Sequence, residues 1–207
     1  TVFRAVKRML KPLPEVEQTF SMVVITDRPE SPSPNFGSDG FLMLADCNML
    51  IDPGTDELAM VAVESGRLAS EYLGRPARVA LLSHSNLGTA NSESSRRVAA
   101  ATTLARQLAK QRNLDLSIIG EVQVDVAMNP KAAESKGQRG QHQPADVLVF
   151  PNQDAGHIAY KLLVHVGGFP VYGQMVVGLA GPVSQLPRNA PAAQIFGTAL
   201  MIGAEAI

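Results

Sequence analysis

The chain has 207 residues, 45% of them hydrophobic, and a formal net charge of −1. This charge offers no basic surface for nucleic acid or anionic lipid, and no apolar run approaches the roughly 20 residues that cross a bilayer, so we expect neither partner. The single cysteine, Cys47, excludes an internal disulfide and favours a reducing compartment, which predicts a cytoplasmic protein. The chain begins without an initiator Met or a secretory signal, and we expect an N-terminal part that is missing or a domain that is fused upstream.

The first third of the chain predicts two helices and two strands. An amphipathic pattern within 1–11 indicates a helix, and apolar runs at 21–26 and 41–45 indicate strands that pair with each other. A longer helical pattern follows over about 56–73, and Gly74 ends it.

From residue 78 onward, strand and helix patterns alternate. Strands are predicted over 78–82, 116–119, 146–150 and 175–179, and helices over about 93–111, 124–135, 155–166 and 191–206. Such alternation favours a parallel sheet with helices on both faces. The strands are nearly continuous apolar runs, as expected where both faces are buried. The predicted fold class is therefore α/β, with three α-β-α layers and a mostly parallel sheet.

Clusters of polar residues begin where four of these strands end. Ligands of open parallel sheets bind in the crevice beyond the carboxyl ends of the strands. We therefore expect one shared site. Its candidate residues are Ser83, His84, Ser85 and Asn86, then Glu121 and Asp125, then Asn152, Asp154 and His157, and finally Arg188.

Each cluster also has an explanation that needs no ligand. Backbone N–H groups at residues 83–89 would attract phosphate, but a capped turn accounts for the same residue types equally well. Arg188 could hold a phosphate with two hydrogen bonds or be a solvated surface arginine. His157 fits a hydrogen-bonding residue at a helix start, and His142 and His165 show no catalytic pattern.

The acidic pair Glu121 and Asp125 has two interpretations. With His84 and His157 it would form the acid/base or metal site of a hydrolase. However, no HxxxH, HxH or CxxC spacing supports a metal, and acids at a helix start are stabilised by the helix dipole. We therefore predict no metal site and keep a metal hydrolase as a further alternative.

Several short motifs lie in a fixed order along almost the whole chain. They are residues 41–48, the Asp52-Pro53 pair, and residues 78–86, 120–127, 146–161 and 182–188. Together they resemble the phosphate acetyltransferase (phosphotransacetylase) family. The resemblance implies a two-domain α/β protein in which acyl-CoA and phosphate meet in an interdomain cleft and give acyl phosphate and CoA.

The resemblance also implies a domain division and partners. The chain is similar to the last two thirds of the family, so residues 1–17 and 172–207 would be pieces of an incomplete first domain and residues 18–171 the second domain. Coenzyme A or acetyl-CoA would be a ligand, no cofactor would be tightly bound, and phosphate or acyl phosphate would be the second substrate. The family further implies a homodimer.

The resemblance assigns roles to individual residues. Arg188 corresponds to the arginine that binds phosphate or the transition state, and Arg4 lies where the family keeps a second phosphate-binding arginine. Pro187 stands in place of the family's serine, and Gln194 in place of the aspartate that deprotonates the CoA thiol. The implied substrate-binding residues are Ser83, His84, Ser85, Asn86, Asn152, Asp154 and Gly173.

The altered positions bear on catalysis. Gln194 cannot act as a base near neutral pH, and Pro187 offers neither a hydroxyl nor an N–H to an oxyanion. Residues 81–88 and 182–188 are also similar to the C-terminal region of large NADP-type malic enzymes, which binds acetyl-CoA as a regulator, while Asp46-Cys47 favours the true transferases. We therefore expect an acyl-CoA-binding domain with impaired catalysis and a regulatory role. The alternative is an active phosphate acetyltransferase in which His84 or Asp154 replaces the missing base.

Overall fold

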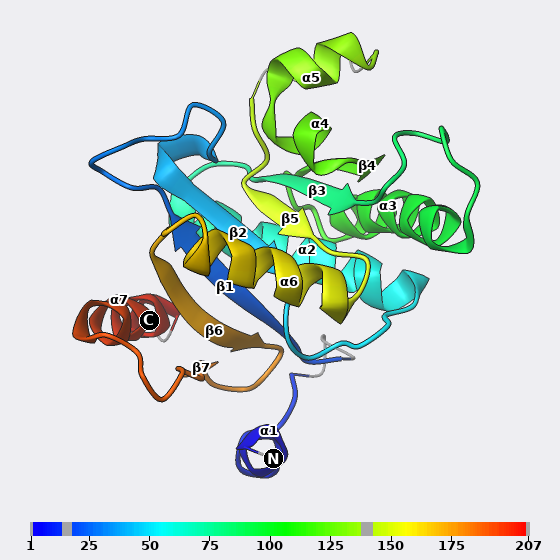
Figure 1. Ribbon diagram of the computed structural model, residues 1–207. Coiled ribbons are helices and arrows are strands. Elements are labelled where there is room, and N and C mark those ends of the chain that lie inside the picture. The colour runs from blue at the N-terminus through cyan, green and yellow to red at the C-terminus, as the bar shows by residue number, and fades with distance from the viewer. Residues whose placement is uncertain (1, 14–17, 138–142, 206–207) are drawn as a thin grey trace.

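The computed structural model describes residues 2–13, 18–137 and 143–205, and it shows a single twisted sheet with helices on both faces (Figure 1). The strands are β1 (Phe20–Thr26), β2 (Phe41–Ala45), β3 (Arg78–Leu82), β4 (Ser117–Val122), β5 (Val147–Val149), β6 (Val171–Val177) and β7 (Val183–Ser184). The helices are α1 (Val2–Met9), α2 (Thr55–Leu73), α3 (Glu93–Gln111), α4 (Val124–Met128), α5 (Pro130–Ser135), α6 (Gln153–His165) and α7 (Ala192–Glu205), with a 3₁₀ turn at Ser38–Gly40.

The seven strands lie in the order β4-β3-β5-β2-β1-β6-β7. The four strands from β4 to β2 are parallel to one another. β1 runs antiparallel to both β2 and β6, and β7 runs antiparallel to β6. The predicted α/β class is confirmed, as is the pairing of the first two strands, and the sheet is mixed because β1 and β7 are reversed.

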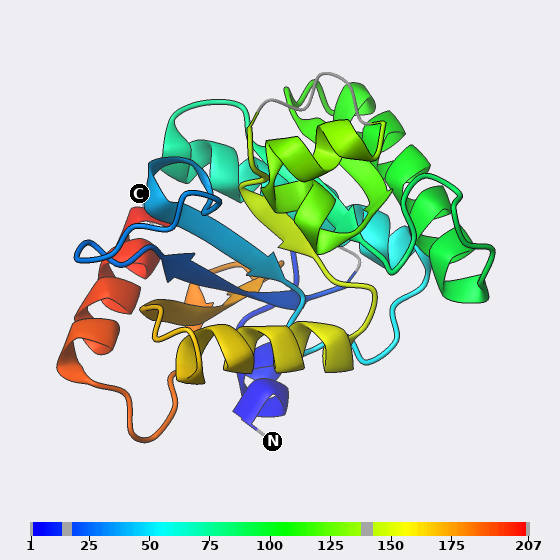
Figure 2. The same ribbon diagram turned by 45° about the horizontal axis from the view of Figure 1, so that its top comes forward.

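Two apolar cores explain the continuous hydrophobic runs. Successive residues of a strand point to opposite faces, so Val79 and Leu81 enter the core beneath α2 and α3, while Ala80 and Leu82 enter the core beneath α4, α5 and α6. The same two layers of helices lie on opposite sides of the sheet in Figure 2. A strand of this kind needs apolar residues at every position, which is the pattern that the sequence shows.

Three predicted boundaries were wrong. The strand expected over 116–119 spans Ser117–Val122, so Glu121 lies within β4 and not in the loop after it. The other two have identifiable reasons. The helix expected over 124–135 is two helices, because Asn129 leaves the helical conformation, caps α5 and places Pro130 at its first position. The last long strand spans Val171–Val177 rather than 175–179. Its first half is neither continuously apolar nor regular, since Gly173 has φ of 93° beside a register shift in the pairing with β1.

The ends of the chain meet the same edge of the sheet. β6 pairs with β1, and α7 contacts β6 through the hydroxyl of Thr198, which accepts a hydrogen bond from Gly173 N at 2.9 Å. The segment after α1 reaches the other end of β6, where Leu13 N donates to Gly178 O at 2.9 Å. Residues 172–177 thus share one sheet with residues 20–26, and the two-domain division stays a prediction. None of the described helices has the length and apolar character needed to cross a membrane.

Candidate functional site

Four hydrogen bonds, one of them buried and three partly buried, connect the loop after β3 to the end of β4. Ser85 donates its hydroxyl to the Glu121 carboxylate at 2.9 Å, and Gly88 N donates to the same oxygen at 2.6 Å. Asn86 and Gln123 exchange two hydrogen bonds of 2.7 and 2.8 Å. The polar residues of this predicted binding loop therefore hold the loop in place, as the capped-turn interpretation expects.

The candidate hydrolase residues do not converge. Glu121 is engaged by the loop after β3, whereas Asp125 forms a 2.6 Å ion pair with Lys136, and this hydrogen bond lowers the pKa of Asp125. His84 lies 3.4 Å from Ser92 at the start of α3. Within the described ranges, no three His, Cys, Asp or Glu side chains gather as metal ligands.

A buried aspartate organises the loop after β2. Asp46 accepts hydrogen bonds from the Ser21 hydroxyl and from the backbone N–H groups of Asn48 and Leu50 at 2.8 and 2.7 Å. The adjacent Cys47 is fully buried, and this burial, with a smaller contribution from Asp46, raises the pKa of its thiol far above the usual range. Cys47 is therefore a packing residue and not a nucleophile.

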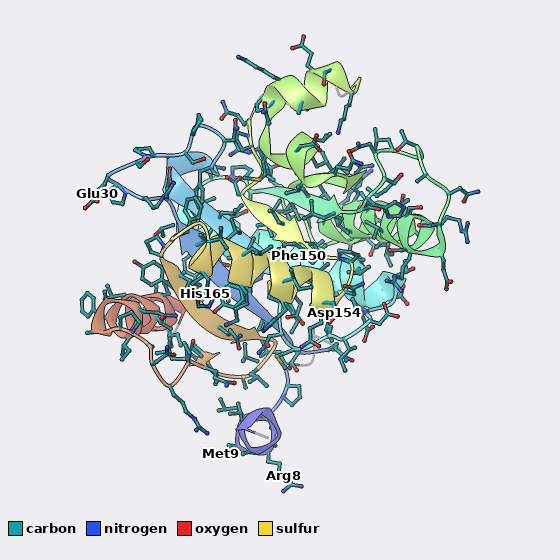
Figure 3. All side chains as sticks on the ribbon, viewed as in Figure 1. Arg8, Met9, Glu30, Phe150, Asp154 and His165 are labelled. Carbon is teal, nitrogen blue, oxygen red and sulfur yellow. The ribbon has the colours of Figure 1, made fainter. Side chains whose placement is uncertain are left out.

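The loop after β5 starts α6. The side chain of Asn152 accepts a hydrogen bond from Ala155 N at 2.9 Å and caps the helix, and Asp154 is exposed in its first turn. His157 lies one turn further, with its Nδ1 3.3 Å from Cys47 O. Figure 3 shows Asp154 and His165 at opposite ends of α6.

A hollow of about 440 Å³ lies between the second half of α6, the start of β6 and the start of α7. Its volume is in the range of small-molecule sites. It is lined by Tyr160, Lys161, Val164, His165, Phe169, Pro170, Val171, Tyr172, Pro187, Asn189, Pro191, Ala193 and Gln194.

The hollow contains both positions at which the resemblance implies a departure from the family. Pro187 and Gln194 line it, whereas Arg188 is exposed and is not among its lining residues. Because α6 runs back along the sheet, this hollow lies near the beginning of β6, away from the loops that follow β3, β4 and β5. Residues 83–86 and 152–154 do not line this hollow together with residues 187–194, and the expectation of one shared site at the strand tips stays a prediction.

Two further predicted site residues are Gly173 and Arg4. Gly173 is buried, and its N–H is bonded to Thr198 of α7; it is not among the residues that line the hollow. Arg4 belongs to α1, but its side chain lies outside the described part of the chain.

Sequence reasoning gave no site role to two ionisable residues of the hollow. Lys161 and His165 are four residues apart on α6 and therefore lie on one face of the helix. Their spacing was a usable signal, but nothing in the sequence showed which face of α6 would meet the start of α7. Lys161 Nζ lies 4.6 Å from the centre of the Tyr160 ring, a cation–π contact.

A second hollow, of about 380 Å³, lies between α2 and the β6–β7 turn and has internally paired charges. Glu64 forms ion pairs with Arg67 and Arg112, and Arg67 also pairs with Glu71 at 2.6 Å. The hollow beside α6 is the better candidate site because it contains the buried Gln194 amide, whose nitrogen has no partner in the described part of the chain.

Comparison with known proteins identifies the family. Residues 1–202 match the model of the phosphate acetyl/butaryl transferase family. The chain is 37% identical over 192 residues to the phosphate acetyltransferase of Acetivibrio thermocellus, an alignment that covers 92% of this chain and 54% of that protein. It is 37% identical over 166 residues to the phosphate acetyltransferase of Bacillus subtilis, covering 80% and 50% of the two chains.

Solved structures agree with this result. The EutD phosphotransacetylase from Staphylococcus aureus superposes with a TM-score of 0.85 at 31% identity, covering 99% of this chain and 59% of that one. A phosphotransacetylase from Streptococcus pyogenes gives 0.83 at 29% identity, covering 98% and 58%. The chain thus spans about half the length of the curated relatives it matches. With its family model matched over nearly every residue, the chain belongs to the phosphate acetyl/butaryl transferase family.

Proposed function

We propose that this chain binds acyl-CoA and phosphate through the hollow between α6, β6 and α7, and that it transfers the acyl group slowly compared with its relatives. The observation that carries the proposal is the presence of Pro187 and Gln194 together in that hollow. Family membership supplies the substrate class, because the relatives named above are phosphate acetyltransferases.

The reaction interconverts an acyl phosphate and a thioester, and it is described here in the direction of thioester formation. The CoA thiolate attacks the carbonyl carbon of acetyl phosphate, the carbon–sulfur bond forms, and the carbon–oxygen bond to phosphate breaks. The thiol proton must first be removed, and negative charge develops on the carbonyl oxygen and on the departing phosphate. A base and cationic or N–H donors therefore determine the rate.

Neither Gln194 nor Pro187 can supply the base or the oxyanion donor that the reaction needs. Gln194 accepts no proton, and the loss of a general base costs roughly 10²–10⁴ in rate. Pro187 has no N–H or hydroxyl for the oxyanion, and a lost donor costs about 10²–10³. Arg188 is exposed and has freedom to approach a bound phosphate, which supports its role in binding. A regulatory role, as in the large malic enzymes, is the function we propose for such a binding domain.

An active phosphate acetyltransferase is the second candidate, and it is the activity that two relatives of 37% identity are named for. In this alternative a residue other than Pro187 or Gln194 acts as the general base. Asp154 and His84 are exposed, but they lie apart from the hollow, so neither would reach a thiol bound there without rearrangement.

Arsenate-dependent loss of acetyl phosphate or acetyl-CoA tests the two candidates in the purified full chain. The proposal expects saturable acetyl-CoA binding with turnover at least a hundredfold below that of an assayed relative. Robust turnover that Arg188→Ala abolishes and Arg96→Ala retains would establish the active enzyme instead; Arg96 is an exposed arginine on α3 and serves as the matched control. Absence of acetyl-CoA binding would refute both candidates.

Further properties of the whole protein also stay proposals. We expect CoA to act as a substrate or ligand with no tightly bound cofactor, a homodimer in solution, a cytoplasmic location, and a fused or preceding N-terminal domain. Size-exclusion chromatography with light scattering tests the dimer.

A further inference from the structure

Gln174 lies at the base of the hollow, between two of the segments that line it. β6 and β7 are paired side by side (Figure 1), and next to this pairing Gln174 and Gln185 exchange backbone hydrogen bonds of 2.8 and 2.9 Å. The Ser184 hydroxyl also donates to Gln174 O at 2.8 Å. Two residues further along each segment, Tyr172 and Pro187 line the hollow. The backbone pair of Gln174 and Gln185 therefore sets where these two walls begin.

A side chain from another part of the sheet holds Gln174 from outside the hollow. Asn48 Nδ2 donates to Gln174 Oε1 at 2.6 Å, and the two residues are 126 positions apart in the chain. The contact is partly buried, so water competes less for its donor and acceptor than it would at the surface. Neither residue is among those that line the hollow.

The loop that carries Asn48 is itself fixed. The backbone N–H of Asn48 donates to the Asp46 carboxylate at 2.8 Å, and Leu50 N donates to the same carboxylate at 2.7 Å. Asp46 is 4% exposed, so these bonds are shielded from water. The loop after β2 is thus a firm support, and one hydrogen bond between side chains links it to the strand pair at the base of the hollow.

We propose that Asn48 and Gln174 are positioning residues for the hollow: their hydrogen bond holds the Gln174–Gln185 pair in place and so fixes the wall at 187–191 relative to the wall at 170–172. A site whose wall is held less firmly must order that wall when a ligand binds, and this cost weakens binding. The inference rests on the proposed function, since it makes acyl-CoA affinity depend on two residues that do not line the hollow.

Hydrogen exchange in the full chain, without ligand, tests the positioning directly. Asn48→Ala and Gln174→Met each remove the side-chain hydrogen bond, and each should speed exchange of the amides in 183–190 roughly three- to tenfold. Gln174→Glu keeps an acceptor oxygen for Asn48 and should restore most of the protection. Asn129→Ala is the matched control, because it removes the side-chain cap of α5, a helix that does not line the hollow, and should leave exchange in 183–190 unchanged.

Acetyl-CoA affinity, measured by titration calorimetry, gives the functional readout. Asn48→Ala and Gln174→Met should raise the Kd for acetyl-CoA roughly three- to tenfold, in step with the loss of protection. Gln174→Glu should stay close to the unmodified chain because its carboxylate still accepts from Asn48. Asn129→Ala should bind acetyl-CoA as the unmodified chain does, although it is less stable to urea.

Several results would overturn the inference: unchanged exchange in 183–190 in Asn48→Ala, an equal effect of Asn129→Ala, or no rescue by Gln174→Glu. Faster exchange with unaltered acetyl-CoA affinity would also overturn it, because the bond would then be structural only. If Gln174→Met fails to fold by circular dichroism, Asn48→Ala decides. If the unmodified chain binds no acetyl-CoA, the proposed function fails, and the exchange measurement alone decides whether the bond positions the wall.

Discussion

Ser85 donates its hydroxyl hydrogen to the buried carboxylate of Glu121 at 2.9 Å, and this contact joins the loop after β3 to the end of β4. Glu121 is 4% exposed, so its charge depends on the donors Ser85 and Gly88 for stabilisation. A serine that the sequence offered as a ligand-binding group therefore has a structural role as well, and the contact can be tested by mutation.

Removing the Ser85 hydroxyl should destabilise the fold without affecting the hollow. Ser85→Ala leaves the Glu121 carboxylate with one donor fewer in a buried environment, which costs about 1–3 kcal/mol of unfolding free energy. Urea unfolding measures the change. Ser117→Ala, at an exposed position of β4, is the control and should change stability by less than about 0.5 kcal/mol. Equal effects of the two variants would show that the buried contact contributes nothing.

Asp146 should be among the most sensitive positions for stability. Its carboxylate is fully buried and accepts hydrogen bonds from Arg75 at 2.9 and 3.0 Å, and from the side chain and backbone of Arg78 at 2.8 and 2.9 Å. Asp146→Asn breaks both ion pairs and should cost about 3 kcal/mol, at the low end for buried pairs because the arginines are partly exposed. Asp39→Asn, which changes an exposed partner of Arg75, should cost less than about 0.5 kcal/mol.

Cys47 should remain a protonated, unreactive thiol in the native state. Burial raises its pKa, so the native state holds its proton at alkaline pH while the unfolded chain releases it. Stability is therefore unaffected below the ordinary thiol pKa and falls above pH of about 9, by up to about 1.4 kcal/mol per pH unit. Unfolding measured between neutral and alkaline pH should show this slope, and Cys47→Ala should remove it. Rapid modification of the native thiol by a maleimide would contradict the burial.

Gly173 should not accept a side chain. At φ of 93°, a Cβ atom would lie 2.9 Å from Met175 N and 3.2 Å from Met22 O, and left-handed backbone strain adds to the cost. Gly173→Ala should lower stability by at least about 2 kcal/mol and loosen the contact of α7 with β6. In contrast, Gly203 in α7 faces open space, so Gly203→Ala should be neutral or stabilising by up to about 1 kcal/mol.

A carboxylate at position 194 should affect catalysis and substrate binding in opposite directions. Under the proposed function, Gln194→Asp would supply the missing base, and we expect kcat for acetyl-CoA formation to rise at least tenfold, in the direction expected for general-base catalysis. The same change replaces an amide donor by an anion, so KM for acetyl phosphate should rise as well. Steady-state kinetics measures both constants, and an unchanged kcat would show that position 194 does not limit turnover.

The sequence alone determined the class of fold and the family. Apolar runs such as 78–82 and 41–45 predicted strands with the observed bounds, because strands buried on both faces need uninterrupted hydrophobic residues. Local capping signals such as Ser92, Asn152 and Gly74 also appear where the sequence places helix ends. Patterns of this kind depend only on residues that are close in sequence, so they can be recognised without the tertiary structure.

Only the tertiary structure decided which polar residues share a hollow. Ser85, Glu121 and Asn152 are residue types that often bind ligands. In the structure, however, Ser85 donates a hydrogen bond to Glu121, and Asn152 accepts one from the backbone of α6. Lys161 and Gln194 are far apart in sequence and come together because α6 runs back along the sheet to the start of β6, where the chain turns into α7. Whether a polar side chain is satisfied internally or left to meet a ligand depends on such long-range packing, which residue types and spacing do not encode.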